Sequence, residues 1–152
     1  MATTSAHDVA AFILKESGPM TAMKLQKLVY YCQAWSLVWD EKPLFKEKIE
    51  AWANGPVVRA LYEKHRGKFK VSSWSVGSSS KLDATQRETV SSVLKFYGDK
   101  TSQWLSDLTH REKPWLEARK GLDDSERGNT EIKHSEMAEY YSGLQSDHQQ
   151  KD

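Results

Sequence analysis

Residues 20–39 read MTAMKLQKLVYYCQAWSLVW, and their pattern predicts the central helix of the fold. Thr21 is suited to begin this helix, because its hydroxyl can accept a hydrogen bond from the first turn. Apolar side chains then recur at steps of three and four residues, which is the spacing of one helix face. Further apolar residues widen that face, so most of the helix must be covered and we expect it in the middle of the core. The stripe comprises Leu25, Leu28, Val29, Cys32, Trp35 and Trp39, and the residues that widen it are Tyr30, Tyr31, Leu37 and Val38.

Helical patterns also precede and follow this segment. Ser5 and Asp8 resemble a capping box, and the helical run after them stops at Gly18. Asp83 and Gln86 resemble a second capping box, before a helix that ends at Gly98. Three shorter helices are expected after it, at 101–109, 114–120 and 130–144. The fold class predicted is mainly α, a compact single domain of about six or seven helices around the long central one.

The segment between the central helix and residue 80 has a different pattern. Residues 48–52 alternate between polar and apolar side chains, which is typical of a short strand. Gly55 and Pro56 are expected to open another helix, with proline at the first helical position. Residues 68–80 are expected to form a loop with a short strand that pairs with 48–52. We therefore expect a short β-hairpin or an extended arm near 48–54 and 71–76, with an edge that a partner segment can join.

Composition and charge exclude several classes of protein. The chain has 152 residues, 22 basic and 21 acidic residues, and a formal charge of +1, so a nucleic-acid partner is disfavoured. Its single cysteine, Cys32, cannot form an internal disulfide, and no apolar run is long enough to cross a membrane. We expect no membrane partner and a cytoplasmic location. The domain is expected to span residues 1–144, and the polar residues 145–152 are expected to be a disordered tail.

Residues that carry chemistry are sparse. The five histidines form no His-Glu-x-x-His motif and there is no cysteine pair, so we expect no metal site, no cofactor and no catalytic residue. Cys32 lies on the apolar helix face, where a thiol is inert. Two alternatives stay open: a small hydrolase that uses His110 with the neighbouring Glu112, and a nucleic-acid module that uses the basic run 59–70.

Two blocks of sequence carry a family resemblance. The first contains Leu-Gln-Lys-Leu at 25–28 and Glu-Ala-Trp at 50–52, followed by Gly-Pro-Val at 55–57. The second contains Leu-Thr-His at 108–110 and Pro-Trp at 114–115. In order and spacing, from about residue 8 to 142, the chain resembles the Panacea-domain antitoxin family, which includes SocA-like antitoxins and phage-associated GepA-like proteins.

This resemblance implies an antitoxin of a bacterial or phage toxin–antitoxin pair, which neutralises its cognate protein toxin by direct protein–protein contact. SocA-like members also act as adaptors that deliver the toxin to an ATP-dependent protease, and this is the alternative reading. Polar members of the two blocks are harder to explain by packing than the apolar ones, and function usually lies at loop and exposed polar positions. The residues expected to contact the toxin are Lys24, Lys27, Tyr31, Gln33, Trp52, Asn54, Gly55, Pro56, Arg59 and His110.

Overall fold

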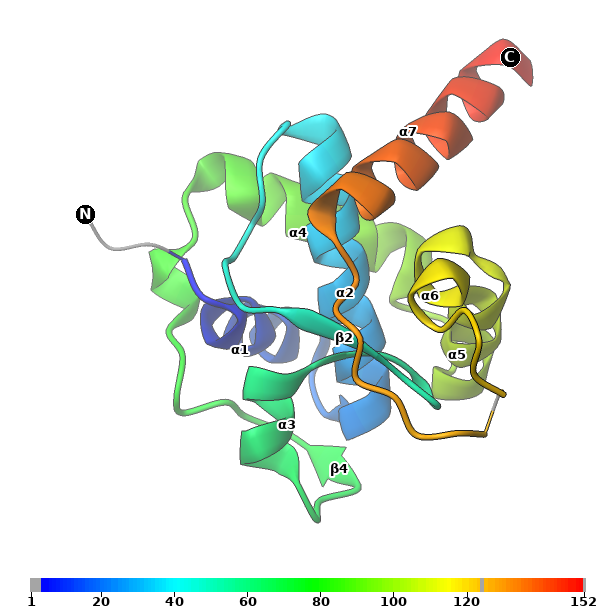
Figure 1. The fold of residues 1–152 in the computed structure, drawn as a ribbon. Coiled ribbons are helices and arrows are strands. Elements are labelled where there is room, and N and C mark those ends of the chain that lie inside the picture. The colour runs from blue at the N-terminus through cyan, green and yellow to red at the C-terminus, as the bar shows by residue number, and fades with distance from the viewer. Residues whose placement is uncertain (1–3, 124, 152) are drawn as a thin grey trace.

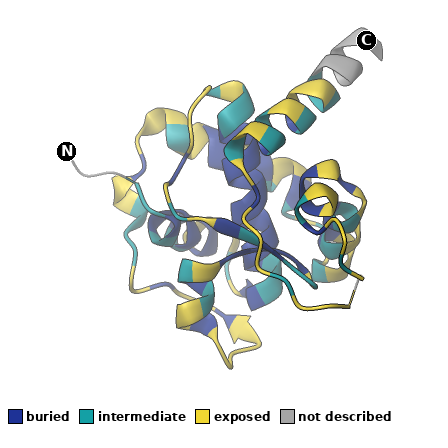
Figure 2. Cartoon of the chain, in the orientation of Figure 1, coloured by how far each residue is buried: buried dark blue, intermediate teal, exposed yellow. Residues whose placement is uncertain are grey.

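Helix α2 (Ala22–Trp39) runs through the middle of the molecule, and the other elements are arranged around it (Figure 1). The structure is a computed structural model that describes residues 4–123 and 125–151, without the side chains of 146–151. Thr21 caps α2 by accepting a hydrogen bond from the backbone N–H of Lys24. Every residue from Leu25 to Ser36 is buried, as the dark blue α2 in Figure 2 shows. The predicted central helix is therefore confirmed.

The mainly α fold is confirmed as well. Both predicted capping boxes form, one at Ser5 and Asp8 and the other at Asp83 and Gln86, because each pair exchanges hydrogen bonds between side chain and backbone. In the part of the chain that is described, the other helices are α1 (Ala6–Ser17), α3 (Arg59–His65), α4 (Ala84–Tyr97), α5 (Ser102–Arg111), α6 (Lys113–Ala118), α7 (His134–Lys151) and the 3-10 turn η1 (Ser79–Lys81).

Helix α7 begins later and ends later than its pattern predicts. It starts at His134 rather than near residue 130, because residues 130–132 are extended alongside a strand. Its backbone stays helical to Lys151, through residues that were expected to form a disordered tail. Neither glycine nor proline occurs between Gln145 and Lys151, so nothing local ends the helix. Asp152, the last residue of that expected tail, lies outside the described residues.

The β structure consists of two small antiparallel pairs, and its expected pairing was wrong. Strand β2 (Ile49–Trp52) pairs with β3 (Gly55–Val58), whereas β1 (Met20–Thr21) pairs with β4 (Lys70–Val71). A two-residue loop joins β2 to β3, so this pairing closes a far shorter loop than pairing with 71–76 would. Gly55 and Pro56 therefore begin a strand, and helix α3 starts only at Arg59.

Strand β2 does not offer a free edge at its centre. On the side away from β3, the backbone N–H of Ala51 donates to Thr130 O at 2.8 Å, and that of Ile132 donates to Ile49 O at 2.8 Å. Both edges are thus paired there, and the expected joining of a partner segment is not open to β2 in this conformation.

Candidate partner-binding surfaces

Half of the ten residues expected to contact a toxin lie in the interior. The buried ones are Lys27, Tyr31, Gln33, Gly55 and Pro56, the half-buried ones are Lys24, Trp52 and His110, and the exposed ones are Asn54 and Arg59.

Gln33 holds a loop against the central helix. Its Oε1 accepts hydrogen bonds from the backbone N–H groups of Leu44 at 2.7 Å and Phe45 at 3.3 Å. Its Nε2 donates to the carbonyl of Phe45 at 2.8 Å. A buried amide that completes three backbone bonds explains a polar residue on a buried helix face. Gln33 therefore positions the loop before β2 and is not itself on a surface.

Tyr31 belongs to a buried cluster around the carboxylate of Glu112. The hydroxyl groups of Tyr31 and Tyr141 both donate to Glu112 Oε1, each at 2.7 Å. Burial raises the pKa of Glu112, while the two phenol donors oppose that rise. Burial and the neighbouring carboxylate together hold the pKa of Tyr31 well above its usual range. The cluster joins α2, the α5–α6 junction and α7 through one carboxylate.

Lys27 and Gly55 form a second buried contact. Lys27 is fully buried, and among the described residues its Nζ has no hydrogen-bond partner. Burial lowers the pKa of this amine to about 7. A Cβ at residue 55 would lie 2.5 Å from Lys27 Cε and 3.2 Å from Thr109 Oγ1. Gly55 also has φ = +121°, so this position requires glycine for both space and backbone conformation.

Lys24 and His110 both bond to backbone carbonyls. Lys24 Nζ donates to Gly98 O at 2.7 Å, beyond the last turn of α4. His110 Nε2 lies 3.0 Å from Ala53 O and must donate there, since a carbonyl only accepts. Because Glu112 bonds instead to Tyr31, the two residues proposed as a hydrolase pair do not contact each other through a hydrogen bond.

Side chains from other segments hold the β2–β3 hairpin around its turn by bonding to its backbone carbonyl groups. Four consecutive carbonyl groups, those of residues 51–54, each accept a hydrogen bond from a side chain between residues 106 and 119. We call this arrangement the carbonyl clamp. Its pairs are Arg119 with Ala51 at 3.1 Å, Trp115 with Trp52 at 2.8 Å, His110 with Ala53 at 3.0 Å and Ser106 with Asn54 at 3.1 Å. The clamp physically connects the two blocks of sequence that carried the family resemblance.

Trp52, Asn54 and Arg59 are brought together in one depression beside the hairpin. This hairpin pocket has a volume of about 930 Å³ and lies between the hairpin, α3 and the loop 125–129. Its remaining lining residues are Glu50, Ala53, Tyr62, Arg66, Ser125, Arg127, Gly128 and Asn129.

The hairpin pocket carries more positive than negative groups. Arg59, Arg66 and Arg127 are exposed around it, whereas Glu50 is the acidic residue among its described lining residues. Arg59 lies 3.9 Å from Glu50 and 3.5 Å from Glu63, and because its side chain is still 57% exposed, part of its guanidinium remains open to a further partner. Trp52 is fixed, because its Nε1 donates to Glu50 Oε1 at 2.8 Å and its ring packs against that of Tyr62 at 4.8 Å. The pocket thus presents fixed aromatic edges and exposed guanidinium groups.

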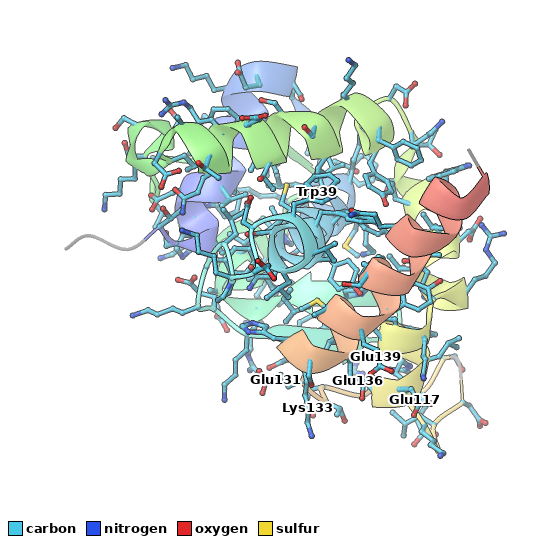
Figure 3. The ribbon with its side chains drawn as sticks, turned by 90° about the horizontal axis from the view of Figure 1, so that it is seen from above. Trp39, Glu117, Glu131, Lys133, Glu136 and Glu139 are labelled. Atoms are coloured by element: carbon cyan, nitrogen blue, oxygen red, sulfur yellow. The ribbon has the colours of Figure 1, made fainter. Side chains whose placement is uncertain are left out.

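A second depression, which we call the aromatic groove, lies between α2, α4, α5 and α7. It has a volume of about 560 Å³, and three of its aromatic residues are exposed: Trp39 by 43%, Phe96 by 62% and Trp104 by 39%. Figure 3 shows Trp39 at the end of α2, on the side of α4. The lining residues are Trp35, Trp39, Ser92, Val93, Phe96, Tyr97, Trp104, Leu108, Glu112, Leu144 and Gln145.

Sequence reasoning missed this groove. The sequence pattern places Trp39 on the apolar face of the central helix and predicts no contact role for Phe96 or Trp104. The usable signal was present, since an aromatic residue on the polar side of an amphipathic helix is a candidate contact residue.

A third surface feature is acidic. Glu117, Glu131, Glu136 and Glu139 gather around Lys133 where α6 meets the start of α7, as the labels in Figure 3 show. The hairpin pocket is rich in arginine, so the molecule has surface regions of opposite charge.

Residues 4–123 and 125–151 lack both a metal-binding cluster and a membrane-spanning helix. No group of three or more His, Cys, Asp or Glu residues is placed there to hold a metal ion. None of the helices over that same range combines the length and the apolar character needed to span a bilayer.

Comparison with known proteins identifies the family. The family described as "Antitoxin SocA-like, Panacea domain" matches residues 25–116, which is more than half of the chain. No curated protein and no solved structure matches this chain. The match covers α2, the hairpin, α3, α4, α5 and the first residues of α6. The chain therefore belongs to the family of SocA-like antitoxins with a Panacea domain.

Proposed function

We propose that this protein is an antitoxin that neutralises a cognate protein toxin by direct contact, with the hairpin pocket as part of the contact surface. The family supports the antitoxin role. The observation that carries the choice of surface is that the pocket gathers Trp52 and Asn54 of the rigidly held hairpin with Arg59, the first residue of α3. The single buried, unpaired Cys32 agrees with action in the reducing cytoplasm.

The carbonyl clamp supports this choice of surface. Because residues 51–54 are already fixed by four side-chain hydrogen bonds, a partner does not have to order them on binding. Surfaces that are ordered in advance bind with a smaller loss of conformational entropy, and tryptophan and arginine are the residues that most often anchor such contacts.

The charge of the pocket indicates the chemistry of the partner segment. Among the described lining residues there are three arginines and one glutamate, so an acidic segment of the toxin is the complementary partner. Guanidinium groups bind carboxylates with two parallel hydrogen bonds, which favours an Asp- or Glu-containing strand or loop over a merely polar one.

Co-expression with the product of the neighbouring gene tests the proposal. We expect the wild-type chain to restore growth and to co-purify with that product. The double variant R59E/R127E should lose both, because it reverses two of the three positive charges. The double variant K46E/K48E is the matched control, since it makes the same two charge reversals at exposed loop residues outside the pocket. Full rescue by R59E/R127E would contradict the choice of surface, and no rescue by the wild-type chain would contradict the function.

The choice of host strain distinguishes an antitoxin that blocks the toxin from an adaptor that delivers it to a protease. In a strain that lacks its ATP-dependent proteases, an antitoxin that blocks the toxin by contact still restores growth. An adaptor restores growth only where the protease is present.

A further inference from the structure

The floor of the aromatic groove contains a carboxylate that accepts its hydrogen bonds on one of its two oxygens. Glu112 is 4% exposed and accepts both of its hydrogen bonds, from Tyr31 and Tyr141, on Oε1. Its Oε2 accepts no hydrogen bond from the described residues, yet it is absent from the fully enclosed polar atoms, and Glu112 lines the groove. One oxygen of this carboxylate is therefore free toward the groove.

The walls of the groove contain no group that balances this charge. Among the residues whose side chains are described, Glu112 is the only acidic one that lines the groove, and no lysine or arginine lines it. Among the described residues the Tyr97 hydroxyl makes no hydrogen bond to Glu112; it accepts one from Trp35 Nε1 at 3.0 Å. A carboxylate in apolar surroundings is stabilised when a cation pairs with it.

The aromatic walls favour a cation as well. Trp35 and Trp39 stack with ring centres 5.0 Å apart, and Phe96 packs edge-on against Tyr97 at 4.7 Å. The faces of such rings attract ammonium and guanidinium groups. The chain itself makes one such contact near the groove, where Lys100 Nζ lies 5.0 Å from the centre of the Trp104 ring.

We propose that the aromatic groove binds a segment of a partner protein that carries a lysine or arginine between apolar residues, with the cation paired to Glu112 Oε2. The aliphatic part of that side chain packs against the aromatic walls while its charged end reaches the floor. The apolar neighbours cover Trp39, Phe96 and Trp104, which a small cation would leave in water. This site is separate from the hairpin pocket and has the opposite charge preference.

The test uses the full chain and three probes. These are a 12-residue peptide with a central lysine flanked by leucine and phenylalanine, the same peptide with norleucine in place of lysine, and tetramethylammonium chloride. Binding is followed by tryptophan fluorescence and calorimetry. We expect saturable binding of the lysine peptide and binding at least about tenfold weaker for the norleucine peptide, as loss of one buried charge pair predicts.

Variants assign the binding to named residues. Glu112→Gln keeps an oxygen for both tyrosine donors, so it is expected to fold and to weaken the lysine peptide about tenfold while leaving the norleucine peptide unchanged. Trp104→Ala should weaken both peptides, because it removes a wall rather than the charge. Arg59→Glu lies in the hairpin pocket and should change neither, which keeps this test independent of the proposed function.

Four results would overturn the proposal. These are no saturable binding of the lysine peptide, equal binding of the two peptides, no effect of Glu112→Gln, and full competition by tetramethylammonium at the same affinity. A fifth is self-association in ultracentrifugation that both Trp104→Ala and Phe69→Ala abolish. Phe69 is 79% exposed between Lys68 and Lys70, so that result would identify a second copy of this chain as the occupant.

Discussion

The side chain of Lys27 lies directly against the backbone of Gly55, so that a Cβ at residue 55 would come within 2.5 Å of Lys27 Cε. The two residues are 28 positions apart in the sequence, and the hairpin brings them together. The contact places a buried amine without a partner, as far as the described residues go, beneath the turn that begins β3.

Replacing Lys27 with methionine should stabilise the protein. The substitution removes a buried amine without a hydrogen bond and keeps a flexible side chain of similar size, so the free energy of unfolding is expected to rise by about 1–3 kcal/mol. Urea denaturation near pH 7 measures the change. Lys24→Met is the control, because that lysine has a bond to Gly98 O to lose, and it should not stabilise. A less stable Lys27→Met variant would mean that the amine has a partner.

The gain in the free energy of unfolding from Lys27→Met should become smaller as pH rises. In the unfolded chain the pKa of Lys27 is near its ordinary 10.5, whereas burial lowers it to about 7 in the folded protein. Between these values the unfolded chain binds more protons than the folded one, so wild-type stability rises with pH. The difference between variant and wild type should fall by about 1–2 kcal/mol between about pH 7.5 and about pH 9. Burial also lowers the pKa of His65, and the nearby charge of Lys27 lowers it further. His65 therefore stays neutral between about pH 7.5 and about pH 9 and does not contribute to the change. A difference that does not vary with pH would show that Lys27 is not buried as an amine.

Gly55→Ala should destabilise the protein by about 2–4 kcal/mol, since it adds a carbon where there is no space and forces a left-handed φ on a residue with a side chain. Chemical denaturation measures the loss. In the double variant with Lys27→Ala the contact with Lys27 disappears, whereas the 3.2 Å approach to Thr109 Oγ1 and the backbone part remain, so the two substitutions should couple favourably by about 1 kcal/mol. Strictly additive effects would argue against the contact.

Tyr31→Phe should cost about 1–2 kcal/mol, because it removes one of the two donors to the buried Glu112 carboxylate. Thermal and urea unfolding check this value. Tyr62→Phe is the matched control, as no hydrogen bond of the Tyr62 hydroxyl is seen among the described residues, and it should be nearly neutral. Equal effects of the two substitutions would show that the hydrogen bond from Tyr31 to Glu112 does not stabilise the core.

His110→Ala should loosen the hairpin without unfolding the domain. It removes one of the four bonds of the carbonyl clamp, so faster hydrogen exchange is expected at the amides of residues 51–55, with little change in the α2 amides. Mass spectrometry after exchange reads both regions. If the hairpin amides keep their protection, the remaining three bonds suffice to hold it.

The sequence predicted the helices better than the hairpin, and the reason is physical. The capping boxes at Ser5 and Asp83 and the apolar stripe of α2 are local patterns, and both are observed. Gly55 and Pro56 are compatible with the start of a helix or of a strand, and in the fold they pair with β2 while Gly55 packs against Lys27 and Thr109. Tertiary contacts decided that segment.

The candidate site was predictable only in part for the same reason. Trp52, Asn54 and Arg59 do gather in one pocket, but Lys27, Tyr31 and Gln33 were selected because they are polar on a packed helix. Polarity alone does not separate a residue that contacts a partner from one that bonds to a buried backbone. Phe96 and Trp104 were missed because their exposure depends on how α4 and α5 sit against α2 and α7.

The carbonyl clamp has a consequence for how freely this surface can diverge. Its four acceptors are main-chain oxygens, which every amino acid supplies, whereas the donors lie on other segments. Residues 52–54 can therefore exchange their side chains without losing the bonds that fix their backbone. A frame of this kind allows the exposed face of the hairpin to acquire new binding preferences while the scaffold beneath it stays the same.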